Sequence, residues 1–289
     1  MESSTDVFTA VRPLLFSIAY RMLGSVMDAE DVVQDAFLRW QQADQTEVKV
    51  PQAWLTTVVT RLAINRLQSA RRQRETYVGP WLPEPLVTVP DSSGQVELAE
   101  SLSIAFLVLL ERLTPVERAA FLLHEVFDLE YSEIATIVGK TEANCRQLVS
   151  RARKRIGDGP TRFEADPSQA EQLAERFQAA AAGGDLDALV GLLAEDITLW
   201  ADGGGKAPGA VLKPVHGAQA VARLVISRTR AAPADRIVRV VRVNGEAGAV
   251  IYSAGEPRGT MVFEIRGERI QTIYVIANPD KLQKVPRLA

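Results

Sequence analysis

The sequence predicts a multidomain protein in which helical segments are followed by an α+β domain. Apolar residues recur at helical spacing through most of the first 156 residues. After the run Gly157-Asp158-Gly159-Pro160, the pattern changes to short helices and then to alternating, strand-like runs. A chain of 289 residues has room for two or three such domains.

Composition places the chain among ordinary globular proteins. Hydrophobic residues make up 47% and charged residues 24% of the chain, which are average values for soluble domains. The net charge of −3 argues against a uniformly basic nucleic-acid-binding protein, so any DNA contact has to come from local patches. Cys145 is the only cysteine, which excludes a disulfide framework and a cysteine metal cluster. We therefore expect no metal and no cofactor.

The N-terminus and the hydropathy pattern predict a cytoplasmic protein without a membrane partner. The start MESSTDVF lacks the basic residues and the following apolar run of a signal peptide. No apolar stretch of the sequence is long enough to span a bilayer.

The first segment, residues 1–75, is predicted to form a helical bundle. One helix covers residues 7–23, and a second begins near Asp28 with acids in its first turn, where the helix dipole favours them. One face of the second helix is apolar, and the opposite face carries an acidic stripe with a leucine. The residues of this stripe are Asp31, Gln34, Asp35 and Leu38. Composition alone leaves two interpretations open, a solvated face and a docking surface for a basic partner.

The third helix of this segment begins near Pro51 and extends to about Arg74. From Arg61 onward it carries arginines interleaved with amides and no acid, which suits phosphate oxygens and base edges. The candidate DNA-binding residues are Arg61, Asn65, Gln68, Arg71 and Arg72. The polar loop of residues 43–50 lies just before this helix and could hold an unstacked base.

Residues 76–96 are predicted to be an extended linker, because prolines and glycine interrupt every helical run. The motif Trp81-Leu82-Pro83-Glu84-Pro85 is apolar for a linker. It is either a spacer whose tryptophan covers a neighbour or a docking peptide for another domain.

The second helical segment, residues 97–158, is predicted to contain a helix-turn-helix unit. Residues 101–113 form its opening helix, and Thr114-Pro115 begins the next one with proline at the first position. In the stretch 131–156, we expect Ser132 to cap one helix, Gly139 to end it and Thr141 to cap the next.

The last helix of this unit has an apolar stripe on one side and hydrogen-bond donors on the other. The candidate DNA-recognition residues are Arg146, Gln147, Ser150, Arg151 and Lys154. The alternative is a solvated basic helix end, since cations are common there. Such an end lacks the preceding pattern of cap, turn and cap, so we favour DNA recognition.

The third segment, residues 165–289, is predicted to form an α+β cone with a cavity. Helices are expected at residues 168–182, 186–193 and 217–229. Strands are expected at residues 196–202, 236–243, 247–253, 259–266 and 269–277. Turn residues such as Asn244-Gly245 indicate antiparallel hairpins.

Five residues of the third segment are candidates for acid–base chemistry: Asp202, His216, Tyr252, Glu264 and Tyr274. Spacing alone brings no two of them together, so we expect no enzyme. An enzyme, a ligand sensor and a scaffold all remain compatible with such a cone, because a fold does not decide its function.

Three blocks of the sequence together resemble an extracytoplasmic-function sigma factor of bacterial RNA polymerase. They are DAEDVVQDAFLRW, AWLTTVVTRLAINRLQSARR and LTPVERAAFLLHEVFDLEYSEIATIVGKTEANCRQLVSRARKR. The resemblance implies that the acidic stripe docks on core polymerase. It also implies that the arginine-rich helix and the loop 43–50 read and open the −10 element, and that the helix from Ala143 reads the −35 element.

Three further motifs resemble those of the sigma-factor subgroup with a fused C-terminal SnoaL-like domain, a fold of the nuclear-transport-factor-2 superfamily. They are WLPEP, DGGGK and NPDKL. The resemblance implies a built-in regulator that replaces a separate anti-sigma factor. The implied regulatory residues are Trp81, Leu82, Pro83, Glu84, Pro85, Asp202, Gly203, Lys206, Asn278, Pro279, Asp280, Lys281 and Leu282.

The sequence therefore predicts a transcription initiation factor whose partners are core RNA polymerase and promoter DNA. An unidentified small ligand in the C-terminal cavity is a further candidate partner. Two alternatives stay open: a ligand-sensing DNA-binding repressor, and an enzyme of the SnoaL type fused to a transcription factor. A repressor would leave the acidic stripe and the arginine-rich helix without a role.

Overall fold

The computed structural model describes residues 4–74, 76–88, 103–157 and 166–288, except for the side chains of residues 71–74. It divides into two compact units. The first consists of Met1–Thr76 and Phe106–Gly159, and the second of Tyr77–Ala105 and Pro160–Ala289. The linker after the first helical segment is therefore grouped with the C-terminal domain.

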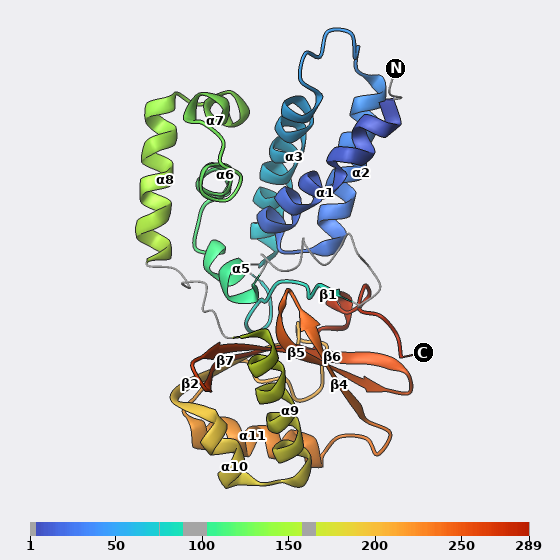
Figure 1. Ribbon diagram of the computed structural model, residues 1–289, viewed down its shortest axis with the longest axis vertical. Helices are drawn as coiled ribbons and strands as arrows, with labels where there is room; N and C mark the ends of the chain where they lie inside the picture. Colours follow the sequence, from blue (N-terminus) through green and yellow to red (C-terminus); the bar gives the residue numbers. More distant parts are fainter. Residues whose placement is uncertain (1–3, 75, 89–102, 158–165, 289) are drawn as a thin grey trace. The chain divides into compact units, whose positions relative to one another are not determined.

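The N-terminal part of the first unit is a bundle of long helices (Figure 1). These are α1 (Ser4–Leu23), α2 (Val26–Gln42) and α3 (Pro51–Arg74). Ser25 caps α2, because its hydroxyl accepts a hydrogen bond from the Asp28 amide at 3.1 Å. The three helices bury apolar side chains such as Leu15, Val33 and Leu55 between them. The predicted bundle is confirmed.

The second part of the first unit contains α6 (Pro115–Glu125), α7 (Tyr131–Val138) and α8 (Glu142–Ile156). It also contains α5 (Ile104–Leu110) from Phe106 onward, whereas Ile104 and Ala105 are grouped with the second unit. As predicted, α6 begins with proline at its first position, Gly139 ends α7 in the left-handed region at φ 66°, and Thr141 caps α8. Thr114 also forms a capping box with Glu117. These signals confirm the helix-turn-helix unit.

The predicted cap at Ser132 is wrong. Glu130 occupies the N-cap of α7, and its amide donates to the Glu133 carboxylate at 3.0 Å. The helix begins at Tyr131, so Ser132 lies exposed in its first turn. The spacing of Glu130 and Glu133 satisfies an orphan amide of the helix terminus, which removes the need for a serine cap.

The second unit is built on one mixed sheet. Its strands are β1 (Val87–Thr88), β2 (Leu193–Asp202), β3 (Val215–His216), β4 (Ile237–Val243), β5 (Glu246–Ser253), β6 (Glu256–Arg266) and β7 (Arg269–Ile276). The strand order is β1-β4-β5-β6-β7-β2-β3. Asn244 and Gly245 take positive φ angles of 54° and 75° in the β4–β5 turn, as a tight hairpin requires.

The predicted antiparallel hairpins are observed, but the sheet also contains one parallel pairing. β2 and β7 run parallel, with Leu199 opposite Ile273 and Ala201 opposite Val275. Turn residues determine only the pairing of strands that follow each other in the chain. Since β3, β4, β5 and β6 lie between β2 and β7 in the chain, no turn residue indicates how these two strands pair.

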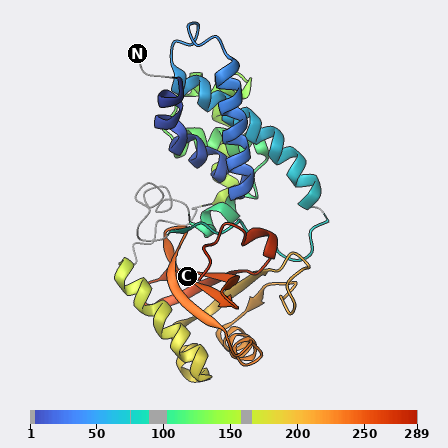
Figure 2. The same ribbon diagram turned by 90° about the vertical axis from the view of Figure 1, so that its right-hand side faces the viewer.

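Helices cover one face of this sheet, as Figures 1 and 2 show for α9. They are α9 (Pro167–Gly183), α10 (Leu186–Leu192) and α11 (Ala218–Arg230). Phe177 of α9 packs on Phe263 of β6 with ring centroids 5.1 Å apart, in a core that includes Leu199 and Ile273. A short 3-10 helix, η1 (Pro279–Lys281), follows the last strand. The predicted α+β cone is confirmed.

The linker contributes an edge strand that the sequence did not indicate. Val87 pairs with Val243 and Thr88 with Arg242. Next to them, the Leu86 amide donates to the Asn244 side chain at 2.9 Å, and the Asn244 amide donates to the Leu86 carbonyl at 2.8 Å. A strand of two residues after a proline-rich run carries no periodicity from which it could be predicted.

Candidate functional site

The exposed face of α8 presents all the predicted recognition residues. Cys145, Val149, Ala152 and Ile156 are buried on the inner side of the helix, and burial raises the pKa of the Cys145 thiol. The outer side exposes Arg146, Gln147, Ser150, Arg151 and Lys154. The helix therefore separates a packing face from a face of hydrogen-bond donors.

The cations of α8 differ in how firmly they are held. Arg146 pairs with Glu142 at 2.9 Å and lies 5.0 Å from the Tyr131 ring centroid. Arg153 pairs with Glu125 at 2.6 Å. Among the described residues, Arg151 and Lys154 form no salt bridge. These two side chains reach an anionic ligand without giving up an existing ion pair.

The basic face of α3 is partly engaged within the first unit. Arg61 donates to the carbonyl oxygens of Thr136 and Ile137, each at 2.9 Å, near the C-terminal end of α7. Asn65 and Gln68 are exposed. The side chains of Arg71 and Arg72 lie outside the described residues, although their backbone belongs to α3.

A second contact ties the two helical segments of the first unit together. The guanidinium of Arg118 is 1% exposed, and it donates to the Met22 carbonyl at 2.7 Å and to Glu111 at 2.8 Å. Arg118 could not be identified from the sequence, because an arginine inside an amphipathic helix carries no sign that it is buried.

The loop between α2 and α3 surrounds a hollow of about 480 Å³. The loop is shaped by Asp44, whose carboxylate accepts hydrogen bonds from the amide and the hydroxyl of Thr46 at 3.0 and 2.6 Å. These bonds lower the pKa of Asp44. The hollow is lined by Ala43, Asp44, Glu47, Val48, Lys49, Val50 and Trp54. Its wall therefore combines polar groups with one aromatic ring.

The predicted acidic stripe of α2 lies on the surface. Asp31, Gln34 and Asp35 are exposed, and Leu38 is 46% exposed. Arg66 of α3 forms salt bridges with Asp28 at 2.6 Å and with Asp31 at 3.1 Å. Arg66 thus neutralises the negative charge at one end of the stripe, whereas Asp35 and Leu38 remain exposed.

In the second unit, the linker is held by a buried charge pair. The Asp202 carboxylate is fully buried and accepts hydrogen bonds from Tyr77 at 2.5 Å, from the Leu82 amide at 2.8 Å and from Lys281 at 2.6 Å. Lys281 also donates to the Leu82 carbonyl. Its ammonium lies 4.0 Å from the Trp81 ring centroid. One linker residue, Leu82, is therefore held at both its amide and its carbonyl.

Further polar contacts join the segment after β7 to the linker and to the loop after β2. Asn278 donates to the Tyr77 hydroxyl at 2.7 Å, and Lys206 pairs with Asp280 at 2.5 Å. Burial and the hydrogen bond to Asp202 raise the pKa of Tyr77. A Cβ atom on Gly204 would lie 2.3 Å from the Asn278 side chain, so this close approach requires glycine.

The structure brings most of the predicted regulatory residues together at this place. Leu82, Pro83 and Pro85 of the linker are buried, as is Leu282, whereas Pro279 is exposed. Tyr77 joins the group although it was not among the predicted regulatory residues. Its position shortly before the WLPEP motif was the only sign in the sequence that it belongs to this site. Its partner Asp202 lies 125 residues away in the chain.

The candidate acid–base residues do not converge on a common cavity. Asp202 is engaged with the linker, His216 contacts Thr198 at 3.1 Å, and Tyr252 donates to the Pro286 carbonyl at 3.2 Å. Glu264 and Tyr274 do interact, and burial followed by the Glu264 charge raises the pKa of Tyr274.

The Glu264–Tyr274 pair lies away from the helices. Strand alternation places it on the opposite sheet face, since Ile273 and Val275 belong to the helix-covered core. Within the described part of the chain, no cluster of residues could hold a metal ion. No helix there is long and apolar enough to cross a membrane.

Comparison with known proteins finds relatives that are similar over nearly the whole chain. Residues 7–73 match the family Sigma-70 region 2, and residues 103–156 match Sigma-70, region 4. The ECF RNA polymerase sigma factor SigJ of Mycobacterium tuberculosis is 43% identical over 293 residues, which cover 96% of this chain and 93% of the relative. A probable ECF RNA polymerase sigma factor SigI from the same species is 32% identical over 276 residues, 94% of this chain and 92% of the relative.

A solved structure extends the similarity to three dimensions. The crystal structure of Mycobacterium tuberculosis SigJ matches with a TM-score of 0.77 and 37% identity, over 99% of this chain and 100% of that one. Both DNA-binding segments and the C-terminal α+β domain are included in these matches. The chain belongs to the family of extracytoplasmic-function RNA polymerase sigma factors.

Proposed function

We propose that α8 binds the −35 promoter element in the major groove. The observation that carries this proposal is its row of exposed donors, backed by a buried apolar stripe that fixes the helix on α6 and α7. Contacts to phosphates supply salt-dependent affinity, and a few side chains at base edges specify the sequence. Arg151 and Lys154 are the first candidates, because neither forms a salt bridge with a described residue.

We further propose that α3 and the loop before it bind and open the −10 element. Asn65 and Gln68 are exposed on the helix, and the nearby hollow includes the ring of Trp54. A base taken out of the stack can be held by an aromatic side chain and polar groups. Arg61 reaches DNA only after it leaves the carbonyl oxygens at the end of α7.

For polymerase binding, we propose the outward part of the acidic stripe on α2. Asp35 and Leu38 lie exposed on the side opposite to buried Val32 and Val33. An apolar side chain within an acidic surface suits a partner helix that carries cations around an apolar contact.

We also propose that the C-terminal domain regulates the sigma factor by holding the linker, in place of a separate anti-sigma factor. The buried Asp202–Lys281 pair supports this, because it binds both polar backbone groups of Leu82. A domain that fixes the linker restricts how the two promoter-binding segments can be spaced. Glu264 and Tyr274 interact, but the other acid–base candidates lie elsewhere, and this proposal assigns the domain no catalytic centre.

Reconstitution of the full chain with core RNA polymerase on a randomised promoter library tests the proposed function. We expect transcripts that start downstream of two enriched sequence elements at a fixed spacing. Reactions without the chain serve as the control. A repressor would bind DNA without polymerase and start no transcripts, and that result would contradict the proposal.

A further inference from the structure

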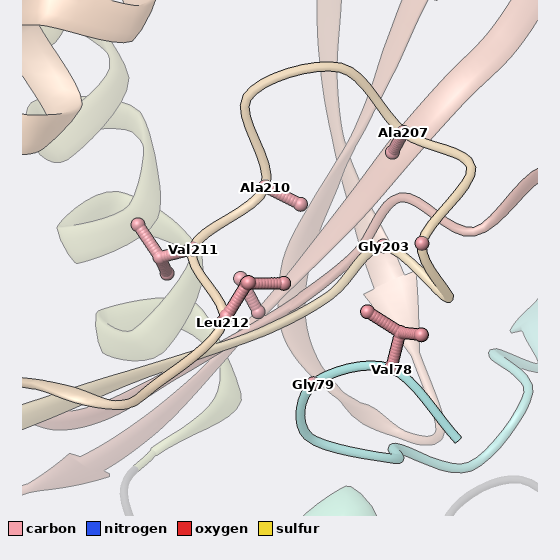
Figure 3. Close-up of a pocket in the computed structure, with 9 residues that line it drawn as sticks. Val78, Gly79, Gly203, Ala207, Ala210, Val211 and Leu212 are labelled. Carbon is pink, nitrogen blue, oxygen red and sulfur yellow. The ribbon is translucent and has the colours of Figure 1, made fainter. Parts of the chain in front are cut away.

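The linker and the loop after β2 enclose a cavity of about 300 Å³ in the second unit (Figure 3). In Figure 3, the Val78 side chain points from the linker toward the loop that carries Ala207, Ala210 and Leu212. Ala201 and Val211, which also border the cavity, belong to or pack against the core of the cone. The full lining is Val78, Gly79, Ala201, Gly203, Gly205, Ala207, Ala210, Val211 and Leu212.

The side chains of the lining are apolar, while polar backbone atoms of the loop and the linker also contribute to its surface. Every side chain that borders the cavity is a valine, a leucine or an alanine, and the other residues are glycines. Val78 and Leu212 are 49% and 61% exposed, which makes them two of the few large apolar side chains left open in the described residues. Neighbouring exposed apolar side chains on a concave surface are typical of a binding site.

The cavity is formed by a loop with a defined conformation. The Gly203 carbonyl accepts hydrogen bonds from the Lys206 and Ala207 amides at 2.9 and 3.0 Å, and the Ala207 carbonyl accepts from Ala210 at 3.3 Å. A Cβ atom on Gly203 would lie 2.4 Å from the Cβ atom of Ala210. Small residues therefore allow the loop to close on itself and leave the space inside its rim empty of side chains.

We infer that this cavity binds a small, uncharged, largely apolar molecule that bridges the linker and the C-terminal domain. Such a molecule would remove the exposed surfaces of Val78 and Leu212 from water. A charged ligand would lose hydration without meeting a counter-ion in the lining. The volume is at the lower end of small-molecule pockets and about twice that of a cavity that accepts benzene.

Occupation of the cavity favours the docked linker. In the sequence, Val78 and Gly79 lie between Tyr77 and Trp81. Tyr77 donates to Asp202, and the Trp81 ring contacts Lys281. A ligand can contact both walls only while the linker is in place, so its binding energy stabilises the docked linker. The consequence for transcription rests on the proposed function, whereas the binding itself does not.

Titration of the full chain with benzene and indole, followed by the methyl NMR signals of Val78 and Leu212, tests the inference. We expect saturable shifts with at least one of these uncharged probes, and at least tenfold weaker binding of indole-3-carboxylate. Ala207→Phe, which fills the cavity, should abolish the response. Ile237→Ser changes a similarly exposed apolar side chain outside the cavity and should leave it intact.

Leu212→Ser is the second variant, because it removes one wall without adding bulk, and it should weaken binding at least fivefold. The inference is overturned if neither uncharged probe gives saturable shifts, if the carboxylate binds equally well, or if Leu212→Ser binds like the parent. Saturable binding by a chain that starts no transcripts with core polymerase would refute the proposed function alone.

Discussion

At the scale of single residues, the cations of α8 should contribute unequally to promoter recognition. Arg151→Ala is expected to lower transcription from a −35-dependent promoter roughly tenfold or more, since a base contact of this kind is worth about 1–3 kcal/mol. Arg146→Ala should lower it less, because Arg146 must first leave Glu142 and the Tyr131 ring. Reconstituted transcription at several salt concentrations measures both effects.

Arg223→Ala is the matched control for these variants. It removes an exposed arginine from a helix of the C-terminal domain, so it should leave promoter choice unchanged. Unaltered promoter selection by the double variant Arg146→Ala, Arg151→Ala would show that α8 does not read the −35 element.

Glu246 makes the stability of the C-terminal domain depend on pH. Its carboxylate accepts a hydrogen bond from the Ile104 amide at 3.2 Å, and burial, aided by the Glu264 charge, raises its pKa to about 8. Between about pH 4.5 and 8 the folded state therefore keeps a proton that the unfolded chain has released. Stability should fall as the pH rises through this window.

Glu246→Gln should remove that fall, because an amide keeps the acceptor for Ile104 but does not ionise. We expect the variant to match the parent near pH 5 and to exceed it at pH 8 by on the order of 1–3 kcal/mol. Hydrogen exchange in β5 and β6 measures the difference. Glu268→Gln, at an exposed turn position, is the control, and an equal gain from it would contradict the assignment.

Individual residues were predictable where local sequence determines their environment. Gly139, Thr141 and the buried stripe of α8 follow from helix periodicity and capping. Arg66, Tyr77 and Arg118 did not follow, because their partners lie far away in the chain, such as Met22, 96 residues from Arg118. Sequence patterns show which side chains can donate hydrogen bonds, but not which distant acceptor the fold brings to them.

At the scale of elements, the outward face of α2 should determine polymerase binding. Asp35→Ala combined with Leu38→Ala is expected to weaken binding to core polymerase by at least tenfold, since both side chains are exposed. The fold should be unaffected, because the inner face of α2 is untouched. Co-purification and a titration of polymerase binding measure the effect, alongside thermal unfolding of the free chain.

Glu175→Ala is the control for the charge change, since Glu175 is an exposed acid on α9. Normal co-purification of the α2 double variant with core polymerase would show that the acidic stripe is only a solvated face.

Elements with strong periodicity were predicted close to their observed bounds, and those without it were not. The expected helix at residues 217–229 is observed as Ala218–Arg230. The two-residue strands β1 and β3 were missed, because alternation needs several residues to be visible. The parallel pairing of β2 with β7 depends on the closure of the whole sheet, which no single stretch of sequence encodes.

At the scale of the whole molecule, the Asp202–Lys281 pair should control release of the linker. Asp202→Asn leaves the Lys281 ammonium, 8% exposed, without its buried partner, which is a change that typically costs about 3–5 kcal/mol. We expect chymotrypsin to cleave the full chain at Tyr77 or Trp81 at least tenfold faster. The double variant with Lys281→Met should be cleaved more slowly than additivity predicts.

Lys206→Met serves as the control, because its salt bridge with Asp280 is exposed on both sides and contributes little. If Asp202→Asn is cleaved at the parental rate, the charge pair does not hold the linker. Truncation from Pro167 onward is a coarser test, and it should change transcriptional activity if the C-terminal domain is a regulator.

The buried charge pair can hold the linker only late in the synthesis of the chain. Lys281 follows Leu82 by 199 residues, and ribosomes add about 5–20 residues per second. Because 125 residues separate Lys281 from Ile156 at the end of α8, every newly synthesised molecule exists for about 6–25 seconds with both promoter-binding segments present and the linker not yet held. Under the proposed regulation, the domain can hold the linker only after Lys281 has been made, so the onset of regulation depends on the speed of the ribosome.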